Sequence, residues 1–375
     1  SEDKMKILVT GGAGFIGSHT VDLLIDKGYD VRIVDNLLEQ VHQSKIPSYL
    51  NKKAEFIKAD VSELNAWKNS LEDVDVVIHL ASMAGIGQSM YEPRDYCNSN
   101  IMGTANFYET LVKNPKIRKQ IKKIIVASSK TIYGEGACNC GKDGLIFPDL
   151  RPLEQLQNRD WELHCPKCGK VMQAAPIPEN RPDQSISIYA ITKYATEKLA
   201  LMYGNTLNIP TIAFRYFSVF GPRQSLSNPY TGVCSIFISR IKNGQQPVIF
   251  EDGNQIRDFT YVDDVAWVNL LAVEKAKKTA VYNVGSGKGV SIKQVAKTIG
   301  EVLGKNVRPI ITNDFRYGDT RNDLSDNSKI ERDLHFKPKY SFKEGIEKLV
   351  EWSKTTEAID KFEEAENERK ILLNK

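Results

Sequence analysis

The chain has 375 residues, enough to bury a large core in two domains or in one domain with insertions. Its composition is that of an ordinary globular protein, and a formal net charge of +4 is too small and dispersed to indicate a nucleic-acid partner or a membrane surface. No apolar run reaches the length of a membrane span, and the opening SEDKMK lacks the layout of a signal peptide, so we expect a cytoplasmic protein.

A glycine-rich loop, GGAGFIG, follows the first predicted strand at 6–10 and precedes a predicted helix at 15–27. Gly11 permits a tight turn, Gly14 lets the backbone approach a pyrophosphate, and Gly17 lets the helix pack closely against the strand. The helix N-terminus adds positive potential. Although an ordinary glycine turn can have this spacing, its place between a strand and a helix predicts a dinucleotide site.

The second predicted strand, at 31–35, ends in Asp35, about 20 residues beyond the loop, where a carboxylate accepts hydrogen bonds from an adenosine ribose. A carboxylate in this place repels a 2′-phosphate, which favours NAD over NADP. Arg32 and Lys45 are near enough in sequence to keep NADP open as an alternative.

Short β-branched runs continue to alternate with helical segments. Strands are predicted at 54–60, 74–81, 122–129 and 209–217, the last after a helix at 189–207. This order predicts an α/β fold, a Rossmann doubly wound parallel sheet with ligands at the carboxyl ends of its strands.

The pattern becomes irregular beyond residue 220, with glycines, prolines and short elements before a predicted helix at 291–303. We therefore expect an NAD-binding Rossmann domain at 1–220, interrupted by a four-cysteine insert at 136–182. The remaining residues, 221–375, are expected to form a smaller C-terminal substrate-binding domain, some segments of which return to the Rossmann sheet.

Tyr189 and Lys193 stand four positions apart in SIYAITK and so share one face of a predicted helix. Ser128 and Ser129 end a predicted strand in ASSKTIYG. A Tyr–Lys pair alone is often a packed tyrosine beside a solvated lysine. Its position after a dinucleotide motif favours catalysis instead.

Five further segments accompany these motifs: HLA at 79–81, NIMGT at 100–104, RYFSVFGPRQ at 215–224, RDFTYVDDVA at 257–266 and NVGSG at 283–287. Together they resemble the extended short-chain dehydrogenase/reductase family, the NAD-dependent nucleotide-sugar epimerases and dehydratases. The resemblance covers nearly the whole chain and implies an NAD site. Its residues would be Gly11, Gly14, Phe15, Ile16, Gly17, Asp35, Asn36, Asp60, Val61, Leu80, Ala81, Ser82, Asn100, Tyr189, Lys193 and Tyr216.

The resemblance also implies three catalytic residues. Tyr189 would be the base, Lys193 would hold the nicotinamide ribose and lower the tyrosine pKa, and Ser129 would hydrogen-bond the reacting hydroxyl. A phenol with a pKa near about 10 is a poor base at neutral pH, so nearby positive charge is needed. Ser128 is the weaker candidate, because Ser129 matches the family position.

Two residues after Ser129 bear on the reaction. Family dehydratases carry an Asp-Glu pair there, whereas this chain has Lys130 and Thr131, so elimination is unsupported. The simplest remaining outcome is 4-epimerisation through a transient 4-keto sugar, which consumes no NAD. A dehydratase whose acid lies elsewhere in the sequence, a ketosugar reductase and a non-catalytic NAD-binding protein are the alternatives.

The substrate would be a nucleotide-diphosphate sugar. By resemblance, Arg257 and Arg316 would bind the diphosphate, for which a guanidinium is well suited, although a surface ion pair is the alternative for each. Ser218 stands where the family usually has Asn, which casts doubt on ordinary UDP-galactose chemistry. The substrate residues would be Gly85, Ser129, Thr131, Ser218, Arg223, Arg257 and Arg316.

The insert contains two close cysteine pairs, Cys138 with Cys140 and Cys165 with Cys168. Such pairs followed by glycine are typical of knuckles around a tetrahedral zinc, and a closed four-sulfur site is structural. Disulfides and unoccupied thiols are the alternatives. His164 is expected to be a bystander.

The other two cysteines, Cys97 and Cys234, are expected to be buried thiols without function. The insert, with the segment around Tyr230, resembles a bacterial subgroup of these epimerases that includes dTDP-L-rhamnose 4-epimerases. This favours a dTDP-6-deoxysugar over a UDP-hexose such as UDP-glucose, UDP-galactose or an N-acetyl form. The family also implies a homodimer, formed through the helix bearing Tyr189 and a helix near 100–111.

Overall fold

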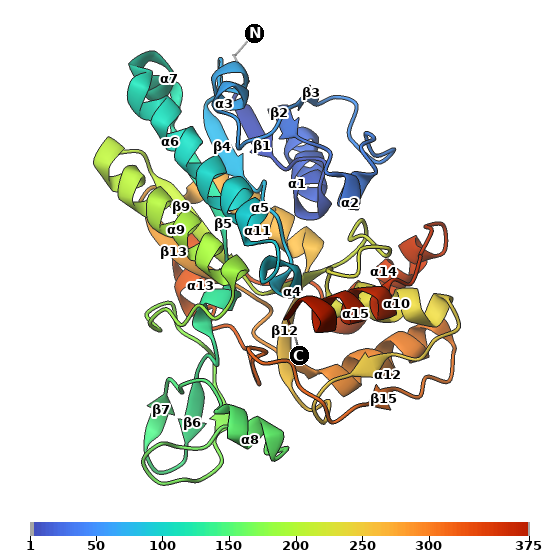
Figure 1. Cartoon of the computed structure of the whole chain (residues 1–375). Helices are drawn as coiled ribbons and strands as arrows, with labels where there is room; N and C mark the ends of the chain where they lie inside the picture. Colours follow the sequence, from blue (N-terminus) through green and yellow to red (C-terminus); the bar gives the residue numbers. More distant parts are fainter. Residues whose placement is uncertain (1–3, 374–375) are drawn as a thin grey trace.

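One large parallel β-sheet forms the centre of the molecule. The computed structural model describes residues 4–373; residues 1–3 and 374–375, among them the start of the N-terminal segment considered above, lie outside that description. Neighbouring strands all run parallel, which confirms the predicted doubly wound α/β sheet (Figure 1). From edge to edge they are β13 (Ala280–Val284), β9 (Thr211–Tyr216), β5 (Lys123–Ser129), β4 (Val76–His79), β1 (Lys6–Thr10), β2 (Asp30–Asp35) and β3 (Glu55–Lys58).

Helices cover both faces of the sheet. On one face α1 (Phe15–Asp26) packs against α11 (Val262–Lys275), and on the other α6 (Gly103–Lys113) lies beside α9 (Ile188–Leu207) (Figure 1). Alternate strand residues serve the two faces: Ile7 joins the core under α1, and Leu8 the core under α6. Burial on both faces explains why the strands read as continuous apolar runs. The shorter helices here are α2 (Glu39–His42), α3 (Leu64–Ser70), α4 (Ile86–Ser89), α5 (Pro93–Tyr96), the π-helix η1 (Cys97–Met102), α7 (Pro115–Gln120), the 3₁₀-helix η2 (Lys130–Tyr133) and α13 (Ser328–Leu334).

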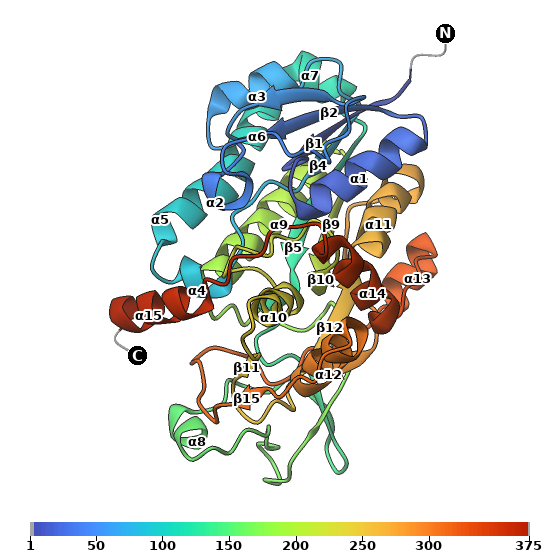
Figure 2. The same ribbon diagram turned by 90° about the vertical axis from the view of Figure 1, so that its right-hand side faces the viewer.

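A second lobe lies beside the carboxyl ends of the strands and has an apolar core of its own (Figure 2). Its small sheets are β10 (Ser218–Phe220), β12 (Ile256–Tyr261) and β14 (Gly289–Ser291), and β11 (Val248–Ile249) with β15 (Ile310–Ile311). Its helices are α10 (Val233–Lys242), α12 (Ile292–Leu303), α14 (Phe342–Ser353) and α15 (Phe362–Leu373). The chain does not stay in this lobe after residue 220, because α11, β13 and α13 all pack on the large sheet.

The cysteine-bearing insert is a separate small sheet at the bottom of Figure 1. It consists of β7 (Gly144–Ile146), β6 (Cys138–Cys140) and β8 (Gln173–Ala174), with antiparallel pairing, and the short helix α8 (Leu153–Gln157). A small cluster that includes Leu163 and Met172 is its apolar core. Within residues 4–373, we find no helix whose length and hydropathy would suit a membrane span.

Two buried arginines attach the insert to the second lobe. Arg151 of the insert pairs with Glu135 and Glu251 at 2.9 Å each. Arg321 pairs with Glu251 at 3.0 Å and with Glu162 of the insert at 2.5 Å. The two guanidinium groups thus share one buried carboxylate and connect three parts of the chain.

Candidate active site

The glycine loop connects β1 to α1 at the carboxyl edge of the sheet. Gly11 has a φ of +66°, in the left-handed region that favours glycine. A Cβ at Gly17 would lie 2.0 Å from the Gly11 carbonyl oxygen, so only glycine lets the helix start this close to the turn. The loop leaves the N-terminus of α1 open to an anionic ligand.

Asp35 at the end of β2 is buried and fixes the neighbouring loops. Its carboxylate accepts hydrogen bonds from the backbone N–H of Ala13 at 3.0 Å and of Leu37 at 2.9 Å. The residue predicted to bind the adenosine ribose therefore also holds the glycine loop in place.

The turn after β4 lies directly against the glycine loop. A Cβ at Gly11 would lie 2.8 Å from the backbone nitrogen of Ala81. The Thr10 hydroxyl accepts from the N–H of Leu80 and of Ala81 at 3.1 Å each, and is 2.7 Å from Nδ1 of His79. Because burial lowers the pKa of His79 to about 3, this histidine is neutral at physiological pH and serves as a fixed hydrogen-bonding group.

A cavity of about 410 Å³ runs along this edge of the sheet. Its wall includes almost every residue predicted to bind NAD, and the glycine cradle with Asp35 at its far end fits a dinucleotide. These lining residues are Gly11, Gly14, Phe15, Ile16, Gly17, Asp35, Asn36, Asp60, Val61, Leu80, Ala81, Ser82, Tyr189, Lys193 and Tyr216.

Asn100 is the one predicted NAD residue that does not line the cavity. Its buried amide accepts from the N–H of Met83 at 2.8 Å and donates to the Thr192 hydroxyl at 2.9 Å. Asn100 belongs to the π-helix η1, a geometry often found at functional sites. In the structure it connects the cavity wall at Met83 to α9 and so acts behind the wall.

The prediction that Cys97 is a buried thiol is wrong, because its side chain is exposed. Cys97 is the first residue of η1, and the buried residue of this helix is Asn100. The same prediction is confirmed for Cys234, which is buried in α10.

Ser129, Tyr189 and Lys193 meet at the end of the cavity beside β5. The Ser187 hydroxyl caps α9 by accepting from the Ala190 N–H at 3.1 Å, which places Tyr189 in the first turn and Lys193 one turn later. Tyr189 shares a hydrogen bond with Ser129. The expected grouping of a phenol, a hydroxyl and an ammonium is thus present in one wall.

Ser128 has a different environment from its neighbour. Its hydroxyl donates to Glu197 at 2.6 Å, and Glu197 forms a buried ion pair with Arg215 at 2.6 Å. The Ser129 hydroxyl instead accepts from the N–H and hydroxyl of Thr131 at 3.2 and 2.9 Å. The geometry therefore supports Ser129 as the hydroxyl available to a substrate.

The two titratable groups of this site have shifted pKa values. Burial lowers the pKa of Lys193 to about 8. Burial raises the pKa of Tyr189, and the hydrogen bond with Ser129 opposes that rise. In the protein alone Tyr189 is therefore protonated at neutral pH, and the lowering of its pKa by Lys193 and nicotinamide stays a prediction.

The predicted substrate residues do not all gather at the cavity. Ser129 and Arg223 line it, and Arg223 also pairs with Asp22 at 2.8 Å. Arg257 donates to the carbonyl groups of Ile256, Arg321 and Thr320 at 2.7–3.1 Å and lies outside the cavity wall.

Arg316 is held by the C-terminal helix α15. It pairs with Glu366, and its guanidinium lies 4.1 Å from the centre of the Phe250 ring. Neither Arg257 nor Arg316 lines the cavity, so their role with a diphosphate stays a prediction. The same holds for Gly85, Thr131 and Ser218, which are likewise absent from the wall.

The cavity also contains residues that sequence reasoning missed. The segment 223–232 contributes Gln224, Ser225, Asn228, Tyr230, Thr231 and Gly232. Tyr230 accepts from the Tyr91 hydroxyl at 2.6 Å and donates to Glu368 of α15 at 2.7 Å. Glycine and proline in GPRQSLSNPYTG indicated a loop, but only the fold shows that the loop and Tyr189 line one cavity.

The insert brings three of its four cysteines together with an aspartate. One ligand atom from each of Cys140, Asp143, Cys165 and Cys168 lies within 4.8 Å of the other three. Cys138 is not in this group, and Asp143 stands in its place. The ring nitrogens of His164 lie near Asp160 and the Gly169 carbonyl, and the expectation that His164 is a bystander stays a prediction.

The sequence matches the model of the NAD dependent epimerase/dehydratase family at residues 7–151 and 167–285. The unmatched residues between these ranges lie within the insert. The chain is 33% identical over 354 residues to the dTDP-L-rhamnose 4-epimerase of Burkholderia thailandensis, covering 93% of this chain and 95% of the relative. It is 35% identical over 350 residues to a putative UDP-glucose 4-epimerase of Methanocaldococcus jannaschii, covering 93% and 98%.

Solved structures show the same architecture. The UDP-glucose 4-epimerase of Thermotoga maritima, determined with UDP-glucose, superposes with a TM-score of 0.77 at 33% identity, covering 93% of this chain and 99% of that one. The chain therefore belongs to the NAD-dependent epimerase/dehydratase family. The predicted class of enzyme, an NAD-dependent nucleotide-sugar epimerase, is confirmed at the level of the family and its relatives.

Proposed function

We propose that this protein interconverts the two configurations at carbon 4 of a nucleotide sugar. The observation that carries the proposal is that Ser129, Tyr189 and Lys193 line the same cavity as the glycine loop and Asp35. NAD bound along the glycine loop would supply a reversible acceptor for the hydride of carbon 4.

The residues of the site move one proton and hold the sugar. Tyr189 takes the proton of the carbon-4 hydroxyl as the hydride leaves, and Ser129 hydrogen-bonds the same oxygen. The charge of Lys193 favours the phenolate of Tyr189. After the 4-keto sugar has turned in the cavity, the hydride would return to the opposite face of carbon 4 and Tyr189 would give the proton back to the carbon-4 oxygen. Because both are returned, no NAD is consumed.

The surroundings of Ser129 argue against elimination of water. Lys130 forms an ion pair with Asp323, and the Thr131 hydroxyl is bonded to Ser129. Among the residues that line the cavity, the carboxylates are Asp35, which ends β2, and Asp60, which follows β3, both at the end predicted for the adenosine. A dehydratase would need an acid near the sugar, which favours simple epimerisation.

We further propose a dTDP-6-deoxysugar, dTDP-L-rhamnose, as the substrate. The similarity to the Burkholderia enzyme over nearly the full length of both chains supports it. UDP-glucose and UDP-N-acetylglucosamine are the alternatives, since structures of 4-epimerases for these sugars superpose with TM-scores of 0.77 and 0.75.

Incubation of the purified enzyme with dTDP-L-rhamnose, UDP-glucose, UDP-galactose and their N-acetyl forms tests both proposals. Nuclear magnetic resonance of the products shows the configuration at carbon 4. The best substrate is expected to be dTDP-L-rhamnose. Faster turnover of a UDP-hexose would overturn the substrate, and loss of water or consumption of NADH without epimerisation would overturn the reaction.

We also propose a homodimer formed by α6 and α9, which lie side by side (Figure 1). Exposed apolar side chains support this surface: Ile191 and Met202 of α9 are 48% and 64% exposed, and Val112 of α6 is 42% exposed. Light scattering of the double variant I191E/M202E should report a monomer. The matched control, Ile371→Glu on α15, should leave a dimer, and a dimer in both variants would contradict the surface.

A further inference from the structure

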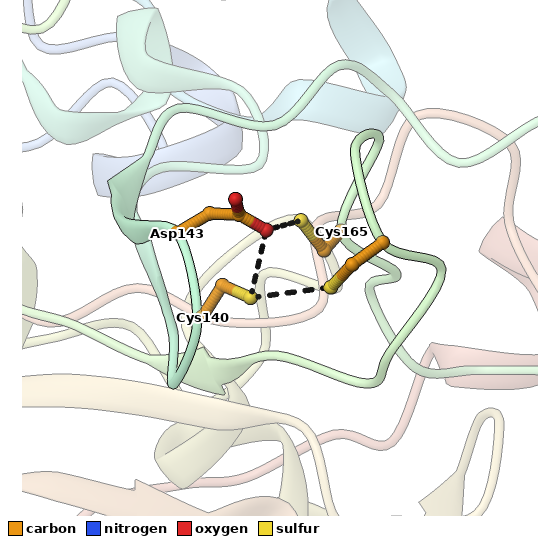
Figure 3. A group of neighbouring side chains, drawn as sticks. Cys140, Asp143 and Cys165 are labelled. Carbon is orange, nitrogen blue, oxygen red and sulfur yellow. Dashed lines mark hydrogen bonds between the residues drawn. The ribbon is translucent and has the colours of Figure 1, made fainter.

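The insert contains a group of side chains that the epimerase chemistry does not use. The Asp143 carboxylate lies 3.2 Å from the sulfur of Cys165 and 3.5 Å from that of Cys140, and the sulfurs of Cys140 and Cys168 are 3.5 Å apart. Figure 3 shows Asp143 and Cys140 of one hairpin and Cys165 of a distant segment pointing toward one another. Four donor atoms within 4.8 Å of one another match the space around one tetrahedral ion.

The strand geometry of β6 explains why Cys138 is not among the donors. Residues two apart in a strand are separated by about 6.6 Å, which is too far for both sulfurs to reach one ion easily. Cys140 instead pairs with Gly144 across the β6–β7 hairpin, so Asp143 in the turn is folded back beside Cys140. A Cys-x-x-Asp turn thus replaces the expected Cys-x-Cys pair.

The second pair of donors comes from a knuckle of the opposite segment. The Cys165 N–H donates to the Lys170 carbonyl and the Gly169 N–H donates to the Cys165 carbonyl, both at 2.8 Å. Gly169 has a φ of +71°, which completes the turn. These bonds hold Cys165 and Cys168 on the same side of the knuckle, facing the hairpin.

The donor chemistry selects the ion. Three thiolates and one carboxylate favour Zn²⁺ over hard cations, and four protein ligands leave no open position for a substrate. Binding would release the thiol protons to solvent. Lys142, Lys167 and Lys170 flank the donors and are exposed, so they offset the excess negative charge.

We propose that Cys140, Asp143, Cys165 and Cys168 bind one structural Zn²⁺, with Asp143 rather than Cys138 as the fourth ligand. The ion joins the β6–β7 hairpin to the knuckle. Glu162, which pairs with Arg321 of the second lobe, lies just before the knuckle, so the ion also fixes the part of the insert that contacts that lobe.

The decisive comparison uses full-length Asp143→Ala and Cys138→Ser. Zinc is measured by mass spectrometry after dialysis against Zn²⁺ and removal of loose metal. Wild type and C138S are expected to keep one equivalent, while D143A loses at least about tenfold in affinity, as does C140S. Full zinc in D143A with loss in C138S would overturn the ligand set, and no zinc in wild type would overturn the site.

Co²⁺ substitution distinguishes loss of a ligand from loss of the fold. Exchange of Asp143 for cysteine adds a thiolate, so the thiolate-to-cobalt absorption of D143C should exceed that of wild type, and that of C138S should be unchanged. NAD binding by each variant reports an intact main fold. Weaker absorption in C138S would contradict the proposal. None of these readouts depends on the sugar that the enzyme converts, so the two proposals fail independently.

Discussion

The nucleotide-facing edge of the large sheet and the cysteine-bearing insert are stabilised in different ways. At the sheet edge, the backbone of the glycine loop contacts adjacent turns directly, and apolar side chains fill both faces of the strands. The insert has only a small apolar cluster and is attached through Arg151 and Arg321. A segment this short buries little apolar surface, so the buried ion pairs contribute a larger share of its stability, and the proposed zinc would add to it.

This difference also separates what each region does. The sheet edge carries the residues proposed to react, and a change there should affect turnover more than stability. The insert holds the second lobe, and a change there should affect stability more than chemistry. Four substitutions can break or sharpen this contrast.

The largest effect is expected at the sheet edge, from Tyr189→Phe. Removal of the phenolic hydroxyl removes the base, which should lower kcat about 10²–10⁴-fold while NAD binding persists. Steady-state kinetics and fluorescence titration of NAD measure the two quantities. Tyr194→Phe, one turn along the same helix, is the control and should retain turnover. Full activity of Y189F would show that this edge is not the catalytic centre.

The next effect is expected beside the insert, from Arg321→Met. Removal of the Arg321 guanidinium leaves the buried Glu251 carboxylate with one partner fewer. This should lower the free energy of unfolding by about 3–5 kcal/mol. Urea denaturation followed by circular dichroism measures the change. Arg332→Met, which removes an exposed pair with Asp333, is the control and should change stability by less than about 0.5 kcal/mol. Equal effects would show that the buried arginines do not attach the insert.

A smaller effect is expected from Lys193, through pH. Because burial lowers its pKa to about 8, the unfolded chain binds more protons than the folded protein between pH 8 and the ordinary lysine value. The free energy of unfolding of wild type, relative to that of Lys193→Met, should therefore rise with pH above about 8. The rise should be at most about 1.4 kcal/mol per pH unit. Denaturation curves of both proteins at several pH values test this. A flat difference would contradict the lowered pKa.

The smallest effect is expected in the second lobe, where α14 begins with a capping box. Ser341 accepts from the Glu344 N–H, and Glu344 accepts from the Ser341 N–H at 2.7 Å. Ser341→Ala should lower the free energy of unfolding by about 1 kcal/mol and leave kcat unchanged. Thermal denaturation and kinetics of the variant provide the check, and a change in kcat would contradict the separation of the two roles.

The sheet and most of the cavity could be predicted because their signals are local. The glycine loop, Asp35 and the Tyr189–Lys193 spacing each report a turn, a strand end or a helix face within a few residues. The parallel order of the strands then brings these segments to one edge without further information. The same physical rule explains why Leu80 and Ala81, at the end of β4, lie beside the loop.

The remaining features depend on contacts between distant segments. Spacing alone could not show that Asp143, and not Cys138, lies with Cys140, Cys165 and Cys168, because a hairpin and a knuckle bring these side chains together. It could not show that the guanidinium of Arg257 donates to backbone carbonyl groups, or that Tyr230 and Tyr189 line the same cavity. The exposed thiol of Cys97 follows from a π-helix, whose extra residue per turn shifts the face that each side chain occupies.

The return of the chain to the large sheet has a mechanical consequence. After β10 and β12 in the second lobe, the chain comes back to form α11 and β13, leaves again for β14, and returns once more at α13. Several crossings join the two lobes, so a hinge motion would have to bend several chain segments at once. Such a connection raises the cost of a large opening compared with two lobes joined by one linker. Residues of the segment 223–232 line the cavity and belong to neither lobe's helices or strands, so they can adjust around a ligand without moving a crossing segment.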